Sequence, residues 1–102
     1  MASNYMLLPR AKRQIREIVW FLAGEGGRPA AQKFLDKLEG QVRLACEHPR
    51  MWPLSGDTRL AGRGYRSFHV GSYLVLYVVR DDVLYVTHVF HRAQDYARIA
   101  AG

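Results

Sequence analysis

The chain has 102 residues, enough for one domain with a single modest core, and we expect no second domain within this length. Its formal net charge of +6, from 15 Lys and Arg against 9 Asp and Glu, suits nucleic acid, an anionic membrane surface or an acidic protein and selects none of them. The single cysteine, Cys46, excludes an internal disulfide, and no segment approaches the roughly 18 apolar residues of a membrane span, so we expect a cytoplasmic protein with no membrane partner.

The N-terminal half predicts a short strand followed by a two-helix hairpin. Residues 5–8 are apolar and end at Pro9, a residue type that commonly opens a helix. Apolar residues then recur at helical spacing up to residue 23 and again from Pro29 onward, with three glycines between the two runs. Pro49 disfavours helical geometry at the residue before it, so the second helix should end there.

The first predicted helix carries a basic face, formed by Arg10, Lys12, Arg13 and Arg16. Two interpretations of this face remain open. It is either a solvated helix surface or a contact surface for nucleic acid or for an acidic partner.

A connecting loop is predicted between the hairpin and the next strand. Residues 48–64 contain two prolines and three glycines and show no clear apolar period. We expect Met51, Trp52 and Leu54 to anchor this loop on the core, with partner binding by the same side chains as the alternative.

Residues 65–96 predict three antiparallel strands and a polar tail. Gly71-Ser72 and Asp81-Asp82 suit two-residue hairpin turns, which fixes the register of the strands. Since directly paired residues share a face, the strands divide into two sets. One holds Arg66, Phe68, Val70, Tyr73, Val75, Tyr77, Val79, Leu84, Val86, His88 and Phe90; the other holds Tyr65, Ser67, His69, Leu74, Leu76, Val78, Tyr85, Thr87 and Val89.

The two sets differ in polarity and therefore predict different neighbours. The first is almost continuously apolar and should lie against the helical hairpin, with Arg66 at the sheet edge or paired with Glu17 or Asp36. The second mixes hydroxyls, a histidine and leucines, which is too polar for a deep core and too apolar for a fully wet surface. We therefore expect a partner to cover the second face.

The chain resembles the RelE/ParE superfamily of bacterial toxins from toxin–antitoxin pairs. The similarity rests on L-P-R-A-K-R-Q-I-R-E-I-V, A-A-Q-K-F-L-D-K-L, H-P-R, G-Y-R-S-F-H-V-G-S-Y-L-V-L-Y and D-D-V-L-Y-V-T-H-V-F-H-R-A-Q-D-Y, in this order over nearly the whole chain. It implies an α+β fold, with an N-terminal strand and a helical hairpin packed on a three- to four-stranded antiparallel sheet that ends in a short tail. The whole chain, residues 1–102, would be one toxin domain.

The superfamily contains two functions on one fold, so individual positions have to separate them. RelE-like members are ribosome-dependent endoribonucleases. They carry cationic side chains at two places on the sheet. One is three residues before the tyrosine that ends the middle strand, which corresponds to Tyr77 here, and the other is on the preceding strand. This chain has Leu74, Tyr65 and Ser67 at those positions, and all three are uncharged. The resemblance therefore favours the ParE-like branch, whose members inhibit DNA gyrase through protein contact without catalysis.

The ParE-like interpretation predicts no catalytic residue, no metal and no cofactor. Its partners would be DNA gyrase and a cognate antitoxin that lays a helix along the hairpin groove and adds extended chain to the sheet, forming a hetero-oligomer. The expected contact residues are Trp52, Leu54, Tyr65, His69, Leu74, Leu76, Tyr85, Arg92 and Tyr96.

Two alternatives stay open. In a RelE-like endoribonuclease acting on mRNA at the ribosome, Arg92 would clamp a phosphate, His91 or Tyr96 would transfer a proton and Asp95 would orient them. The third possibility is an inactive module that only titrates an antitoxin. The four histidines have no recognisable metal-ligand spacing, so metal chemistry is not expected.

Overall fold

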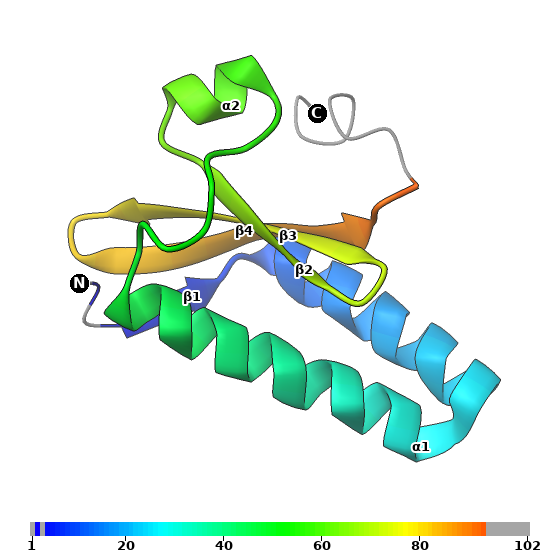
Figure 1. Ribbon diagram of the computed structural model, residues 1–102. Coiled ribbons are helices and arrows are strands. Elements are labelled where there is room, and N and C mark those ends of the chain that lie inside the picture. The colour runs from blue at the N-terminus through cyan, green and yellow to red at the C-terminus, as the bar shows by residue number, and fades with distance from the viewer. Residues whose placement is uncertain (1, 3, 94–102) are drawn as a thin grey trace.

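The structure is a computed structural model that describes residues 2 and 4–93. A four-stranded sheet separates a long helical hairpin on one face from a short helix on the other (Figure 1). In chain order the elements are β1 (Asn4–Leu7), α1 (Pro9–Glu47), α2 (Thr58–Gly62), β2 (Arg66–Val70), β3 (Tyr73–Arg80) and β4 (Val83–His91). The α+β class expected from the sequence is confirmed, and no helix within this part of the chain is long and apolar enough to cross a membrane.

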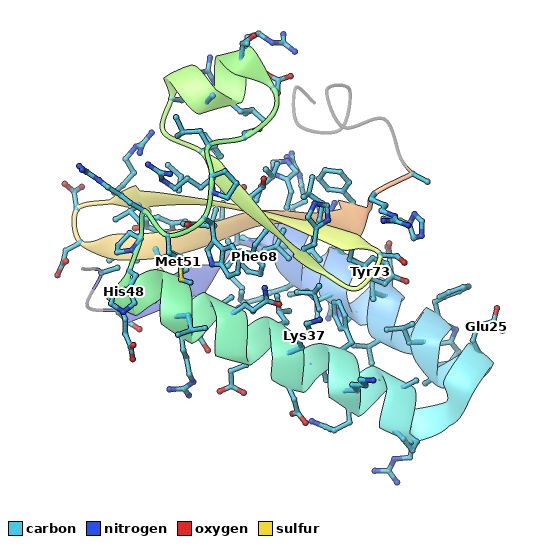
Figure 2. The ribbon with its side chains drawn as sticks, viewed as in Figure 1. Glu25, Lys37, His48, Met51, Phe68 and Tyr73 are labelled. Atoms are coloured by element: carbon cyan, nitrogen blue, oxygen red, sulfur yellow. The ribbon has the colours of Figure 1, made fainter. Side chains whose placement is uncertain are left out.

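The hairpin is formed by α1, which reverses direction at Gly27. This residue has a φ of 77° and a ψ of −177°, a conformation that L side chains rarely adopt, and it divides α1 into arms of residues 9–26 and 28–47. The two arms meet beside Glu25 (Figure 2). The first helix thus runs past Gly24, where the sequence predicted its end, while the second opens near Pro29 and ends at Glu47 as expected.

The sheet has the strand order β1-β4-β3-β2. β2, β3 and β4 form the expected antiparallel meander, but β1 runs parallel to β4, so the sheet is mixed rather than purely antiparallel. Both predicted turns are present. Gly71 has a φ of 59°, and Asp81 and Asp82 have φ values of 50° and 67°, the left-handed geometry that tight hairpins require.

A β-bulge in β4 changes the register between β3 and β4. Leu76 pairs with His88 while the next residue, Tyr77, pairs with Val86, so Thr87 is an extra residue. An extra residue reverses the facing of everything beyond it. The predicted facing of three residues was therefore wrong: Val89 lies in the hairpin-side core, whereas Phe90 and His88 share the opposite face with Leu76.

The main core lies between the sheet and the two arms of α1. Phe68 and Tyr73 extend from the sheet into this layer (Figure 2), and the Tyr73 ring meets Phe34 edge-on at 5.4 Å between centroids. The buried side chains are Ala2, Ala11, Ile15, Ile18, Phe34, Leu38, Val42, Ala45, Phe68, Val70, Tyr73, Val75, Tyr77, Leu84, Val86 and Val89. The helical stripes read from the sequence supply the hairpin half of this core.

A second, smaller core lies on the opposite face of the sheet. Leu60 of α2 packs there on Leu74, Leu76 and Phe90, with Tyr65 at the side. The Asp57 carboxylate caps α2 by accepting hydrogen bonds from two backbone N–H groups of its first turn, at 2.9 and 3.2 Å. The sequence predicted only loop here, because five residues are too few to show a helical period.

Candidate functional site

The outer face of the sheet, meaning the face turned away from α1, carries most of the predicted contact residues. α2 covers part of it. Leu74 and Leu76 are 7% and 0% exposed beneath Leu60, so these two leucines form interior contacts in this conformation. His69 is exposed and Tyr85 is half-buried. The surface open to a partner is thus the part of the outer face that α2 leaves uncovered.

The three positions at which an RNase of this fold would carry cations lie in this region. Leu74 is buried, Tyr65 packs against the α2 cluster and Ser67 is half-buried on the edge strand. Stabilising the charge that builds on an attacked phosphate requires cationic or N–H donors aimed at it, each worth roughly 2 to 4 kcal/mol. An apolar side chain at position 74 cannot supply such a contact.

Backbone carbonyls of the loop before α2 accept hydrogen bonds from side chains of β2 and β3. The Arg66 guanidinium donates to the Trp52 carbonyl at 2.7 Å, and the Tyr77 hydroxyl donates to the Pro49 carbonyl at 2.8 Å. Burial raises the pKa of the Tyr77 hydroxyl to about 12, against the opposing effect of the nearby Arg66 charge. The sequence left two positions open for Arg66, at the sheet edge or paired with a helix carboxylate, and the structure places it at the sheet edge.

The apolar residues of this loop divide between core and surface. The Trp52 ring packs on Phe68 with 5.4 Å between centroids, which agrees with the predicted anchoring role. Leu54 and Met51 are each 47% exposed, so the loop presents them to solvent. Among the apolar residues of this loop, Leu54 is the predicted contact residue that a partner can reach.

A buried histidine joins the first turn of α1 to the bulge of β4. Nη1 of Arg10 lies 2.6 Å from Nε2 of His88, and the His88 Nδ1 lies 3.0 Å from the Thr87 hydroxyl. A guanidinium can only donate, so Nε2 accepts and the ring proton sits on Nδ1, from which it is donated to Thr87. Burial, and then the Arg10 charge, lower the pKa of His88 from 6.5 to about 4. His88 is therefore a neutral structural residue.

A second contact from α1 reinforces this connection. The Gln14 side-chain carbonyl accepts the backbone N–H of Val89 at 2.7 Å, directly after the bulge. Neither Gln14 nor the bulge was identified from the sequence, since nothing in the strand pattern marks an unpaired residue. One sequence feature coincides with the bulge, namely the adjacent polar residues Thr87 and His88 in a strand that is otherwise mostly apolar.

The end of β4 carries the residues considered for catalysis. His91 and Arg92 are both exposed. The Nδ1 of His91 accepts the Ala93 N–H at 3.0 Å and its ring meets Tyr73 edge-on at 5.5 Å, while the Arg92 backbone N–H donates to Ser72 at 2.9 Å. The other members of that set, Asp95 and Tyr96, lie outside the described residues.

Two grooves flank the hairpin. One, of about 390 Å³, lies between β1 and both arms of α1; its apolar walls are Tyr5, Leu7, Ile15, Leu35, Leu38 and Val42, and Asp36 and Glu39 are also among its lining residues. The other, of about 340 Å³, lies between the first arm and the end of the sheet beside His91. Within residues 2 and 4–93, no group of three or more His, Cys, Asp or Glu could hold a metal ion.

Comparison with known proteins identifies relatives over almost the entire chain. The model of a family described as "ParE toxin of type II toxin-antitoxin system, parDE" matches residues 5–96. Two curated relatives, each named Toxin ParE1 and coming from the CDC 1551 / Oshkosh and ATCC 25618 / H37Rv strains of Mycobacterium tuberculosis, are 28% identical over 99 residues, covering 96% of this chain and 98% of theirs.

The fold also has a solved counterpart. A structure of the "Chromosomal ParDE TA system from P. aeruginosa" superposes with a TM-score of 0.70 at 14% identity, covering 89% of this chain and 96% of the other. At that identity the likeness concerns the fold alone. The family model, in contrast, spans the hairpin, the sheet and the start of the tail, and on this basis the chain belongs to the ParE toxin family of type II toxin–antitoxin systems.

Proposed function

We propose that this protein is a toxin that inhibits DNA gyrase by protein–protein contact through the outer face of its sheet. The observation that carries the proposal is the uncharged cluster of Tyr65, Ser67 and Leu74, where a nuclease of this fold would need cations. Membership of the ParE family supports it. A surface without a charge clamp for phosphate is suited to binding a folded partner rather than to cleaving RNA.

The contact would be made by the part of the outer face and its rim that solvent reaches. Leu54, His69 and Arg92 are exposed, and Tyr65 and Tyr85 are half-buried. Aromatic and arginine side chains are the types most often found to carry binding energy at protein interfaces. Leu74, Leu76 and Trp52 would act indirectly, by supporting α2 and the loop. Tyr96, outside the described residues, stays a predicted contact residue.

Two matched histidines test this proposal. Purified protein should inhibit supercoiling by gyrase. His69→Asp should raise the toxin concentration needed for half-maximal inhibition by at least about tenfold, which corresponds to a loss of roughly 1.4 kcal/mol of binding free energy. His48→Asp changes another exposed histidine, the residue that follows the end of α1, and should have no effect. Equal loss in both variants would refute the assignment of the surface.

The same assay separates the two toxin chemistries. Supercoiling that continues at micromolar toxin, together with cleavage of mRNA on ribosomes, would establish the endoribonuclease instead. In that case Arg92→Ala should abolish cleavage without unfolding the protein. Absence of both activities, with antitoxin binding retained, would indicate a module that only titrates an antitoxin.

We also propose that a cognate antitoxin neutralises this toxin through the hairpin side, forming a hetero-oligomer in the cytoplasm. The 390 Å³ groove offers apolar side chains from β1 and both arms of α1, which suits the apolar stripe of a helix. Asp36 and Glu39 also line this groove and favour basic residues at the border of that stripe. β1 is an edge strand beside the groove, so extended chain can pair with it.

Two leucines of the second arm provide a matched test of neutralisation. Leu35 lines the groove, whereas Leu44 is 44% exposed and does not. Co-expression of the neighbouring antitoxin frame should restore growth to cells making wild-type toxin or Leu44→Glu, but not to cells making Leu35→Glu. Rescue of Leu35→Glu as efficient as that of wild type would exclude this groove as the antitoxin site.

A further inference from the structure

The first arm of α1 carries an exposed basic stripe, which we define as Lys12, Arg13, Arg16 and Trp20. All four side chains are exposed, and Trp20 is 84% exposed, the highest value among the large apolar residues described. At 3.6 residues per turn they fall within an arc of roughly 100° and extend about 12 Å along the helix. They point away from Ala11, Ile15 and Ile18, which this arm buries in the core.

Structural roles do not account for the stripe. Within the described part of the chain, Lys12, Arg13 and Arg16 form no ion pair, whereas Arg10 is turned toward His88 and the sheet. Cations in the first turns of a helix face the positive end of its dipole and contribute nothing to its stability. The second arm differs, because its cations alternate with Asp36, Glu39 and Glu47.

We propose that the basic stripe binds the phosphate backbone of duplex DNA, so that the toxin contacts gyrase and its DNA together. This inference rests on gyrase as the target. Duplex DNA carries one phosphate per 3.4 Å of axis on each strand, and the three cations, residues 12–16, span about 6 Å of the helix, close to the two steps that separate three successive phosphates. Arginine forks match phosphate geometry, and the exposed indole of Trp20 adds an N–H donor and a flat ring.

The charge of the stripe also disfavours a second copy of the chain as its occupant. Two stripes facing each other would bring six cations together against only two carboxylates from Glu17, the one acidic residue of residues 9–20. A polyanion is the complementary surface. An acidic patch on a protein would carry the same negative charge as DNA, and a binding measurement with duplex DNA alone distinguishes the two.

The test measures binding of a labelled 20-base-pair duplex by fluorescence anisotropy, without gyrase. Neutralising three phosphates gives a salt slope of about −2.7, so raising salt from 50 to 200 mM should weaken wild-type binding about 40-fold or more. In the triple variant Lys12→Ala, Arg13→Ala and Arg16→Ala, the slope of the logarithm of the binding constant against the logarithm of salt concentration should be smaller in magnitude by about 2.7. The matched control removes three exposed cations of the second arm, Arg28→Ala, Lys33→Ala and Lys37→Ala, and should retain it.

Each other outcome overturns the proposal. If the control loses as much affinity as the stripe variant, DNA binding is a property of the net charge and not of this surface. If the stripe variant binds duplex like wild type but loses affinity for DNA-free gyrase, the occupant is an acidic protein surface. Trp20 emission should be quenched by duplex and this quenching should disappear in Trp20→Phe; unchanged emission places the indole away from DNA.

The two proposals fail separately. The duplex assay contains no gyrase, so loss of the DNA contact leaves gyrase inhibition untouched. Conversely, a toxin that binds duplex through the stripe but does not affect supercoiling would contradict the proposed target, and with it the joint contact with gyrase, but not the binding of DNA by the stripe. Circular dichroism and the urea midpoint check that both triple variants are folded, which is expected because alanine favours exposed helix positions.

Discussion

From the contact between Arg10 and His88 we predict that acidic pH lowers the stability of the fold. His88 is 6% exposed, accepts a hydrogen bond from Arg10 at Nε2 and donates from Nδ1 to Thr87. Protonation would place a hydrogen on the nitrogen that accepts from the guanidinium and a second positive charge beside it. The folded protein therefore resists this protonation, and the pKa of His88 is lowered from 6.5 to about 4.

The magnitude follows from proton linkage. The unfolded chain binds a proton at position 88 as the pH falls through 6.5, while the folded chain does not until about pH 4. Acid therefore favours the unfolded state over this window, and His88 has no effect above about pH 7.5. At pH 5.5 the free energy of unfolding should be lower by about 1.4 kcal/mol, and at pH 4.5 by about 2.5 kcal/mol, than it would be without this titration.

Urea unfolding of wild type and His88→Gln at pH 7.5, 5.5 and 4.5 measures this effect. The glutamine amide can accept from Arg10 and donate to Thr87 but does not titrate, and all carboxylates and the other histidines are common to both proteins. The wild-type protein should therefore lose about 2.5 kcal/mol more than the variant between pH 7.5 and 4.5. Parallel loss in the two proteins would refute the assigned tautomer and the role of Arg10.

Three further predictions concern the fold. Tyr77→Phe should lower the free energy of unfolding by about 1 to 2 kcal/mol because a loop carbonyl loses its donor, whereas Tyr85→Phe should be neutral; urea titration compares them. Gly24→Ala should raise the thermal midpoint, since it adds a helix-forming residue in open space, and Gly71→Ala should lower it, because its φ of 59° is strained for alanine. Leu60→Ala should cost about 2 to 4 kcal/mol and increase proteolysis near α2.

Turn chemistry and periodicity were sufficient to predict most of the fold. The glycines and Pro29 mark the reversal of the hairpin, and the apolar spacing of both arms predicted which residues are buried. Gly71-Ser72 and Asp81-Asp82 fixed the register of β2, β3 and the first part of β4, because a two-residue turn leaves only one pairing. These are local rules, and each depends on residues close together in the chain.

The misassigned features depend on contacts between distant residues. The β4 bulge is held by Arg10 and Gln14, more than seventy positions away, so the strand pattern alone gave the wrong face for Val89 and Phe90. The parallel pairing of β1 with β4 likewise depends on how α1 returns the chain to the sheet. α2 forms because Leu60 finds an apolar surface on the far side of the sheet, and that surface exists only once the sheet is assembled.

The bulge and α2 together determine what the outer face can do. The bulge turns Phe90 outward, where it joins Leu74 and Leu76 to make the surface on which Leu60 rests. A cation introduced at Leu74 would be buried under α2 beside these apolar side chains, and an unpaired buried charge costs several kcal/mol. Converting this face into a phosphate clamp would therefore require displacing α2 as well as changing three side chains. The uncharged positions and the short helix that covers them are thus two parts of one arrangement, which favours a binding surface over a nuclease site.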